Sequence, residues 1–150
     1  MGSPLYFEDF TVGDEFITLS RTVTEADIVA FAGLSGDYNQ LHTDAEFAKD
    51  TLFGERIAHG LLGLAITGGL KQRLGIFDGT VMAFLGLTWD FVGPIRIGDT
   101  IHVRMVVAAT RATHKPDRGI LVQEVELINQ DGRTVQKGRH TVMMRRRPQQ

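Results

Sequence analysis

The sequence contains no cysteine among its 150 residues. This absence excludes disulfide bridges, a thiolate nucleophile and cysteine ligands for a metal. The first residues, MGSPLYFEDF, also lack the basic segment and apolar run of a signal peptide, so we expect a cytoplasmic protein. Uncharged apolar stretches long enough to cross a bilayer are missing too, and no contact with a membrane is expected.

An excess of charge of either sign is also missing. Lysine and arginine together number 16, aspartate and glutamate 18, and the formal net charge is −2. A general nucleic-acid-binding protein normally has a basic patch and a high pI, so nucleic acid is not an expected partner. The hydrophobic content of 43% and charged content of 23% are ordinary for a globular protein. We therefore expect one domain over residues 1–150, long enough to bury a real core.

Two short helices are predicted in the first third of the chain. Thr24, with Asp27 three residues later, resembles a capping box at the start of an apolar stripe that ends near Gly36. A second short helix is expected after His42, with Asp44 as its cap.

Residues 58–70, AHGLLGLAITGGL, contain no charged side chain. The segment is too short for a membrane span, and a helix that is apolar on every side belongs inside a protein. Its four glycines would let neighbouring backbone approach closely. We expect a buried central helix that emerges into solvent where charge returns, at Lys71 and Arg73. A pair of buried strands is the alternative, although glycine weakens strands as well.

From Thr80 onward the pattern is typical of β-strands. TVMAFLGLTWDFV is almost continuously apolar, whereas TIHVRMVVAAT alternates between apolar and polar residues. GILVQEVELIN and RTVQKGRHTVMM follow, separated by turn-like segments, and an earlier strand is expected through Ile17 and Leu19. Short turns between consecutive strands imply an antiparallel sheet. The sequence therefore predicts an α+β fold in which an antiparallel sheet wraps around a central buried helix.

The segment GLSGDYNQLHTDAEFA places a carboxylate, an amide and an imidazole close together, at Asp37, Asn39 and His42. On a helix, Asp37 and His42 would point roughly 140° apart at about 3.6 residues per turn. They can converge only on a turn, which Gly36 and Asn39 favour. Once converged, they can hold one water molecule and share the roles of acid and base. The structural alternative is that Asp37 only forms a turn and His42 is a buried, hydrogen-bonded histidine.

The segment FAGLSGDYNQLHTDAEFA, followed by RIAHGLLGLA, resembles the motif of the MaoC-like and (R)-specific enoyl-CoA hydratase family of hot-dog proteins. Asp37, Asn39, Leu41 and His42 match the motif, while Gln40 stands where the family usually has proline. The resemblance extends from FEDFTVGDEF through WDFVGPIRIGDTI to the closing strands. It implies a hot-dog fold and the reversible hydration of a 2-enoyl-CoA thioester to a (3R)-3-hydroxyacyl-CoA.

The resemblance also implies roles for individual residues. Asp37 and His42 would act on water, and the N–H of Gly60 would bind the enolate oxygen at the positive end of the helix dipole. Asn39 is expected to brace the turn or bind the water. His59 either positions the loop or the thioester, or is structural. Coenzyme A is part of the substrate, so no cofactor is expected. We expect no metal because the pair of Asp37 and His42 lacks a convincing third ligand.

Two other functions stay open. A hot-dog acyl-CoA thioesterase would carry its carboxylate on or beside the central helix, where HGLLGLAITGGL offers none. A non-catalytic acyl-CoA-binding or regulatory protein would not need the intact pair of Asp37 and His42. Hot-dog relatives pair their sheets, and an apolar strand over residues 81–87 needs cover. We therefore expect a homodimer or a multiple of it, with an acyl-CoA thioester as substrate.

Three further interpretations concern the second half of the chain and its end. Trp89 and Phe91 are interpreted as core or interface residues rather than as walls of an acyl pocket. The C-terminal RRRPQQ is expected to be a frayed, solvated tail. The sequence does not indicate which basic residue, if any, meets the CoA phosphates, and the candidates are Lys71, Arg73, Arg96 and Arg104.

Overall fold

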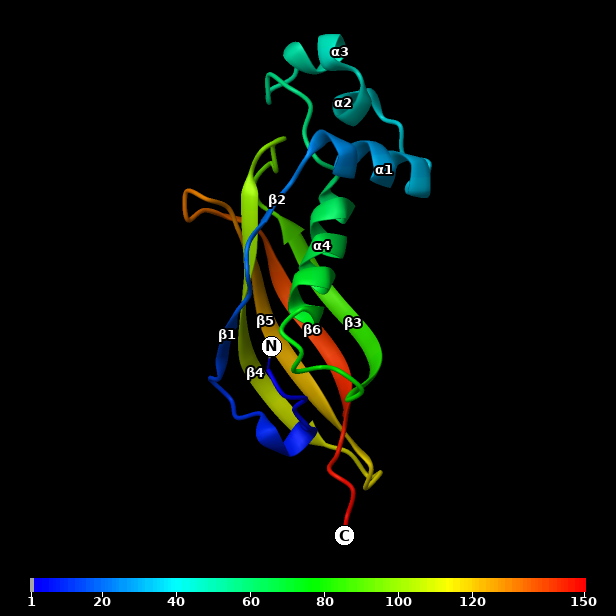
Figure 1. The fold of residues 1–150 in the computed structure, drawn as a ribbon, viewed down its shortest axis with the longest axis vertical. Coiled ribbons are helices and arrows are strands. Elements are labelled where there is room, and N and C mark those ends of the chain that lie inside the picture. Colours follow the sequence, from blue (N-terminus) through cyan, green and yellow to red (C-terminus); the bar gives the residue numbers. More distant parts are fainter. Residues whose placement is uncertain (1) are drawn as a thin grey trace.

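A six-stranded sheet wraps around one long helix in the computed structural model, which describes residues 2–150 (Figure 1). The elements in chain order are η1 (Phe7–Asp9), β1 (Glu15–Ile17), β2 (Arg21–Thr22), α1 (Glu25–Ser35), α2 (Gln40–Thr43), α3 (Ala45–Lys49), α4 (Gly60–Gln72), β3 (Val81–Phe91), β4 (Thr100–Ala112), β5 (Arg118–Ile128) and β6 (Thr134–Arg145). The strands lie in the order β1-β4-β5-β6-β3, with β2 also paired to β4, and all of these pairs are antiparallel. The predicted α+β fold is confirmed.

The long strands turn every second side chain toward α4, as their alternating pattern predicts. In β4 the inward residues Ile101, Val103, Met105 and Val107 are all buried. The first strand differs from the prediction, because β1 ends at Ile17 and that side chain is exposed, as is Leu19. The residue of β1 that packs against the core is Phe16.

The central helix α4 begins at Gly60 and packs Leu62, Ile66 and Leu70 into the core. The prediction of a buried central helix is therefore confirmed. The prediction that this helix emerges at Lys71 is wrong, because the Lys71 side chain is only 6% exposed. Lys71 follows Thr67 by four residues, and this spacing keeps it on a buried face of the helix.

Helices α1, α2 and α3 form a cap across the N-terminal end of α4 (Figure 1). The predicted capping box is present, with the Thr24 N–H donating to Asp27 Oδ2 (2.9 Å) and the Asp27 N–H donating to Thr24 Oγ1 (3.3 Å). The left-handed Gly36 (φ 77°) ends α1. Asp44 caps α3 as predicted, because its side chain accepts the Phe47 N–H at 3.0 Å.

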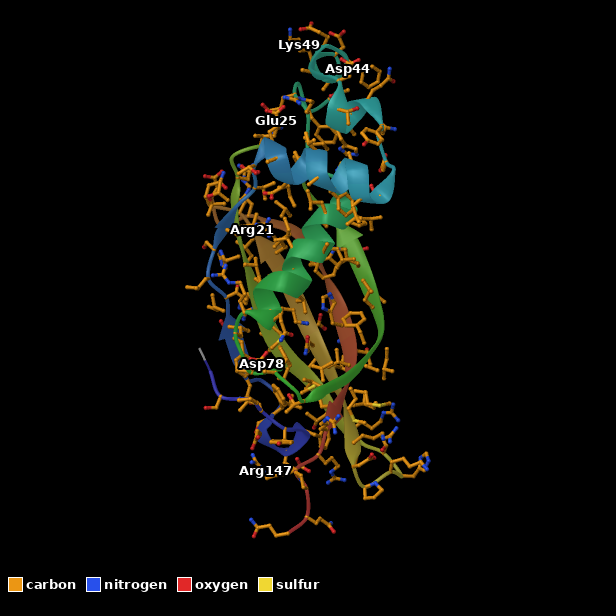
Figure 2. All side chains as sticks on the ribbon, turned by 45° about the vertical axis from the view of Figure 1, so that its right-hand side comes forward. Arg21, Glu25, Asp44, Lys49, Asp78 and Arg147 are labelled. Carbon is orange, nitrogen blue, oxygen red and sulfur yellow. The ribbon has the colours of Figure 1, made fainter. Side chains whose placement is uncertain are left out.

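Charged residues mark the two ends of the molecule. Figure 2 shows Asp44 and Lys49 on the helical cap and Arg147 at the opposite end. There Arg147 forms an ion pair with Asp9 (2.6 Å), and Arg146 forms one with Glu8 (3.0 Å). The expectation of a frayed tail is thus wrong for Arg145, which is the last residue of β6, and for Arg146 and Arg147, which pair with carboxylates of η1.

Strand β3 lies at an edge of the sheet and, among residues 2–150, pairs only with β6. Several of its large apolar side chains are exposed, namely Val81, Phe84, Leu85, Leu87 and Phe91. Among residues 2–150 as a whole, no helix is both long enough and apolar enough to span a membrane.

Candidate active site

A tight turn carries Asp37 away from the end of α1. Its Oδ1 accepts the Asn39 N–H at 3.1 Å, and Asn39 Oδ1 accepts the Leu41 N–H at 3.0 Å. The second of these hydrogen bonds caps α2. The segment therefore adopts the turn that the convergence of Asp37 and His42 requires, and Asn39 braces it.

His42 lies in α2, and its ring is oriented by one short hydrogen bond. Its Nδ1 is 2.7 Å from the carbonyl oxygen of Ile57. Because a carbonyl oxygen only accepts, Nδ1 carries the proton and Nε2 of the neutral ring keeps its lone pair. The half-buried His42 can therefore accept a proton at Nε2.

His59 precedes α4 and is 2% exposed. Its Nε2 donates to the backbone carbonyl of Asp37 at 2.9 Å. Its ring stacks on that of His42, with 3.9 Å between centroids and 26° between planes, and it meets the Phe31 ring edge-on at 4.9 Å. His59 thus holds the two segments that carry Asp37 and His42 in one arrangement.

These contacts bring three side chains together at the start of α4. A carboxylate oxygen of Asp37 and one ring nitrogen each of His42 and His59 lie within 4.8 Å of one another. Two groups that share one water at ordinary hydrogen-bond lengths lie up to about 5.6 Å apart, so the spacing suits a bridging water. Carboxylate and imidazole also bind divalent metals, and His59 is a third potential ligand that the sequence reasoning did not find.

A cleft of about 670 Å³ opens beside this cluster. Its walls include His42, Gly60, Leu61 and Phe91. Gly60 is the first residue of α4, where no preceding helical carbonyl reaches its N–H, and the helix dipole makes this end positive. The arrangement can therefore bind a developing oxyanion at the edge of the cleft.

Two side chains of the sheet hold the first turn of α4. Gln136 Nε2 donates to the Gly60 carbonyl at 3.0 Å, and Trp89 Nε1 donates to Gln136 Oε1 at 2.9 Å. Gln136 is not predicted from the sequence, although a polar residue on the inward face of a strand is a signal that the sequence contains. Trp89 packs against the core, in agreement with its interpretation.

Phe91 does not lie in the core, and its interpretation as an interface residue stays a prediction. Its side chain is 53% exposed and forms part of the cleft wall. The ring also lies against Gly60, because a Cβ atom added there would come within 2.7 Å of two ring carbons. A glycine is thus required at this position for the aromatic wall to approach the start of α4.

The four basic candidates for CoA contact lie in different surroundings. Lys71 is buried, and Arg104 is held by Glu15 and Glu126 on the outer face of the sheet. Arg73 is exposed at the end of α4. Arg96 is next to the cleft, because it follows the wall residue Ile95 and donates to the carbonyl of Phe53, another wall residue, and it also pairs with Glu55 at 2.9 Å.

The sheet around α4 defines a hot-dog fold, and the Asp–His cluster lies at the start of that helix. Residues 9–127 match the family model of the MaoC like domain, and the chain belongs to this family. It is 40% identical over 111 residues to Protein MaoC of Klebsiella aerogenes. The matched segment makes up 73% of this chain and 32% of that protein. The match therefore spans less than half of the Klebsiella protein.

Two further similar proteins are matched over a larger share of their own length. The chain is 39% identical over 103 residues to the (R)-specific enoyl-CoA hydratase of Rhodospirillum rubrum, which covers 68% of this chain and 69% of that enzyme. The crystal structure of a monoamine oxidase regulatory protein from Archaeoglobus fulgidus superposes with a TM-score of 0.91 at 36% identity, covering 98% of both chains.

Proposed function

We propose that the protein catalyses the reversible hydration of a 2-enoyl-CoA thioester to a (3R)-3-hydroxyacyl-CoA. The observation that carries this proposal is the convergence of Asp37, His42 and His59 within 4.8 Å, beside a cleft that His42 and Gly60 line. The similarity to an enzyme named (R)-specific enoyl-CoA hydratase supports it and supplies the expected configuration of the product.

The reaction uses one water molecule, held between the Asp37 carboxylate and His42 Nε2. This pair takes a proton from the water as its oxygen forms a bond to the β-carbon of the enoyl group. The π electrons of the double bond move toward the thioester, whose oxygen gains negative charge and is stabilised by the Gly60 N–H. The pair then delivers the proton to the α-carbon, so that the elements of one water are added overall.

The remaining site residues position the reacting groups. Asn39 fixes the turn, and His59 orients His42 through ring stacking and Asp37 through its backbone. A direct contact of His59 with the thioester stays a prediction. Phe91 and Leu61 form apolar walls of the cleft around the substrate. Arg96 is the basic residue that we assign to the CoA phosphates. The mechanism uses no metal and no cofactor.

We also propose that the active form is a homodimer, or a multiple of it, in which the β3 edges of two chains come together. An open edge strand with exposed apolar side chains favours pairing with a second copy. Val81, Phe84 and Leu87 of β3 are among the exposed residues.

The test of the reaction is the absorbance of crotonyl-CoA in the presence of the protein, followed together with a free-thiol assay. We expect the conjugated enoyl band to disappear without release of thiol, and the rate to survive dialysis against a chelator. Release of thiol would instead indicate a thioesterase. Binding of crotonyl-CoA with neither change would indicate a non-catalytic acyl-CoA-binding protein.

A further inference from the structure

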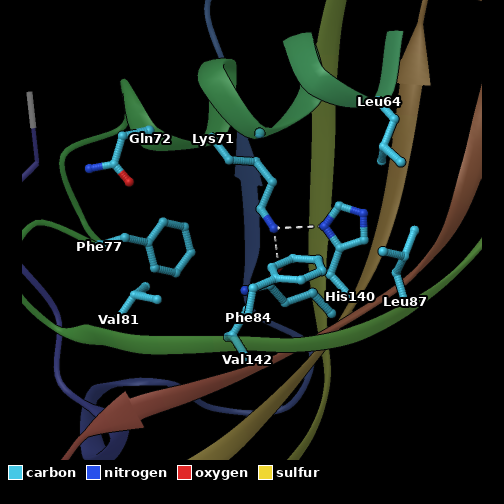
Figure 3. A pocket seen from close by; sticks show the side chains of 11 residues that line it. Leu64, Lys71, Gln72, Phe77, Val81, Phe84, Leu87, His140 and Val142 are labelled. Carbon is cyan, nitrogen blue, oxygen red and sulfur yellow. Dashed lines mark hydrogen bonds between the residues drawn. The ribbon is translucent and has the colours of Figure 1, made fainter. Parts of the chain in front are cut away.

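A second cavity, of about 330 Å³, lies between α4 and the sheet and contains a buried lysine (Figure 3). Lys71 Nζ donates to Gln123 Oε1 on β5 and to His140 Nδ1 on β6, the latter at 3.0 Å. Gln123 and His140 are direct partners in the sheet, so the two strands present them side by side. Apolar side chains surround the three polar ones, as Figure 3 shows for Phe77, Phe84, Leu87 and Val142.

The polar side chains of this cavity have N–H donors without hydrogen-bond partners, and no acidic side chain faces them among the described lining residues. A lysine ammonium has three N–H donors, and the two partners occupy two of them. His140 accepts at Nδ1, so its neutral ring carries the proton at Nε2, and Gln123 accepts through its oxygen and keeps its NH₂ group. Neither His140 Nε2 nor Gln123 Nε2 has a hydrogen-bond partner among residues 2–150. No carboxylate belongs to the described residues that line the cavity.

Burial keeps His140 neutral but disfavours the protonated form of Lys71. It lowers the pKa of His140 to about 3, with a further contribution from the neighbouring Lys71, so this imidazole is neutral near pH 7. Burial also lowers the pKa of Lys71 to about 7. A bound anion would favour the protonated lysine, because an opposite charge nearby stabilises the charged form.

The cavity lies farther along the same two elements that line the cleft of the proposed active site. The cleft is lined by Leu61 of α4 and Phe91 of β3, and the cavity by Leu64 and Gly68 of α4 and Leu87 of β3. From Gly60 to Lys71 the helix rises about 16 Å, at ~1.5 Å per residue. An extended acyl chain with its thioester at Gly60 needs about 13 carbon–carbon bonds to cover this rise, and somewhat fewer because the Lys71 side chain leans back toward the start of the helix.

We infer that Lys71, His140 and Gln123 bind a carboxylate at the far end of the acyl chain, so that the preferred substrates are ω-carboxylated 2-enoyl-CoA thioesters. A carboxylate has two acceptor oxygens and a charge opposite to that of the lysine, which matches a cluster of unpaired donors. A purely apolar chain would leave those donors buried and unpaired, which costs binding energy. This inference rests on the proposed function, because it assigns the acyl chain of the same substrate.

The test compares kcat/KM for 2-decenoyl-, 2-dodecenoyl- and 2-tetradecenoyl-CoA with kcat/KM for the matching ω-carboxylates. We expect the wild type to prefer the carboxylate for at least one chain length. In Lys71→Met the ratio of carboxylate to apolar kcat/KM should fall at least about tenfold, because one charge-assisted hydrogen bond is lost. Lys137→Met, an equal change of charge at an exposed position of β6, should leave the ratio unchanged.

Binding of unreactive ligands separates this inference from the proposed reaction. In calorimetry, dodecanedioyl-CoA should bind the wild type more tightly than dodecanoyl-CoA, and Lys71→Met should abolish the difference. This result without any hydration would overturn the proposed function and keep the carboxylate site. Hydration of the apolar substrates, with no preference for a carboxylate in either assay, would overturn the carboxylate site and keep the hydratase. A preference that Lys71→Met leaves intact would also overturn the assignment.

Discussion

Asp37 and His42 act on one shared water in the proposed mechanism, so their substitutions should not be independent. We expect Asp37→Asn and His42→Ala each to lower kcat by at least about 10²-fold, the effect of losing a positioned acid or base. The double variant should be little worse than the poorer single variant, as is usual for residues that act as a unit. Asp50→Asn, the same change at an exposed position of the cap, is the control. Near-normal turnover in either single variant would show that other residues react.

Lys71 is a residue whose burial should reduce stability in a pH-dependent way. Burial lowers its pKa from the usual 10.5 to about 7, so between these values the unfolded chain binds more protons than the folded one. The free energy of unfolding therefore rises with pH across this window, by up to about 1.4 kcal/mol per pH unit. Below the window, the full destabilisation from burying the charged lysine is present. His140, the other titratable residue that lines the cavity, has its pKa lowered to about 3 and changes charge outside this window. In urea denaturation, Lys71→Met should be more stable than the wild type at about pH 7, and this advantage should shrink toward about pH 10. An advantage that does not change with pH would contradict the buried-lysine interpretation.

At the scale of elements, the start of α4 and the end of β3 form one unit through Gly60 and Phe91. Gly60→Ala should displace the Phe91 ring, since the new Cβ would lie 2.7 Å from two of its carbons. The Gly60 N–H remains but is misplaced, and misplacement on the order of 1 Å can lower a rate by about 10²-fold. We expect kcat to fall by roughly 10-fold to 10²-fold without global unfolding, as measured by steady-state kinetics and circular dichroism. Gly69→Ala on the same helix, where an added Cβ meets nothing within 4 Å, should keep kcat and gain up to about 1 kcal/mol in stability. Equal kinetic effects of the two changes would argue against the role of Gly60.

The elements with a local signal could be predicted from the sequence, and the contacts between distant segments could not. The capping box at Thr24 and the alternation of β4 depend on neighbouring residues, and both predictions are confirmed. The spacing of Asp37 and His42 likewise predicts a turn, and the structure has one. By contrast, the stacking of His59 on His42 depends on how two loops meet. Lys71 was predicted to be exposed because charged side chains usually lie at the surface. Its burial depends on polar partners from two strands of the sheet, β5 and β6.

At the scale of the whole molecule, the open β3 edge makes assembly testable. The wild type should scatter light as a dimer or larger oligomer at micromolar concentration, because a second copy covers the exposed apolar side chains. Leu85→Lys, which places a charge on this edge, should shift the protein toward the monomer and reduce its activity in parallel. Leu19→Lys, a change at a side chain that is 70% exposed near the opposite edge, should do neither. A fully active wild-type monomer would contradict the proposed assembly.

The stereochemistry of hydration tests the shared water most directly. Crotonyl-CoA is hydrated in D₂O, and the configuration of the product is determined at both the α- and β-carbons. Because Asp37 and His42 act on the same water, oxygen and deuterium should reach the same face of the double bond. We expect syn addition and a (3R)-3-hydroxybutyryl-CoA product. Anti addition would contradict the shared water, and a (3S) product would contradict the proposed orientation of the thioester at Gly60.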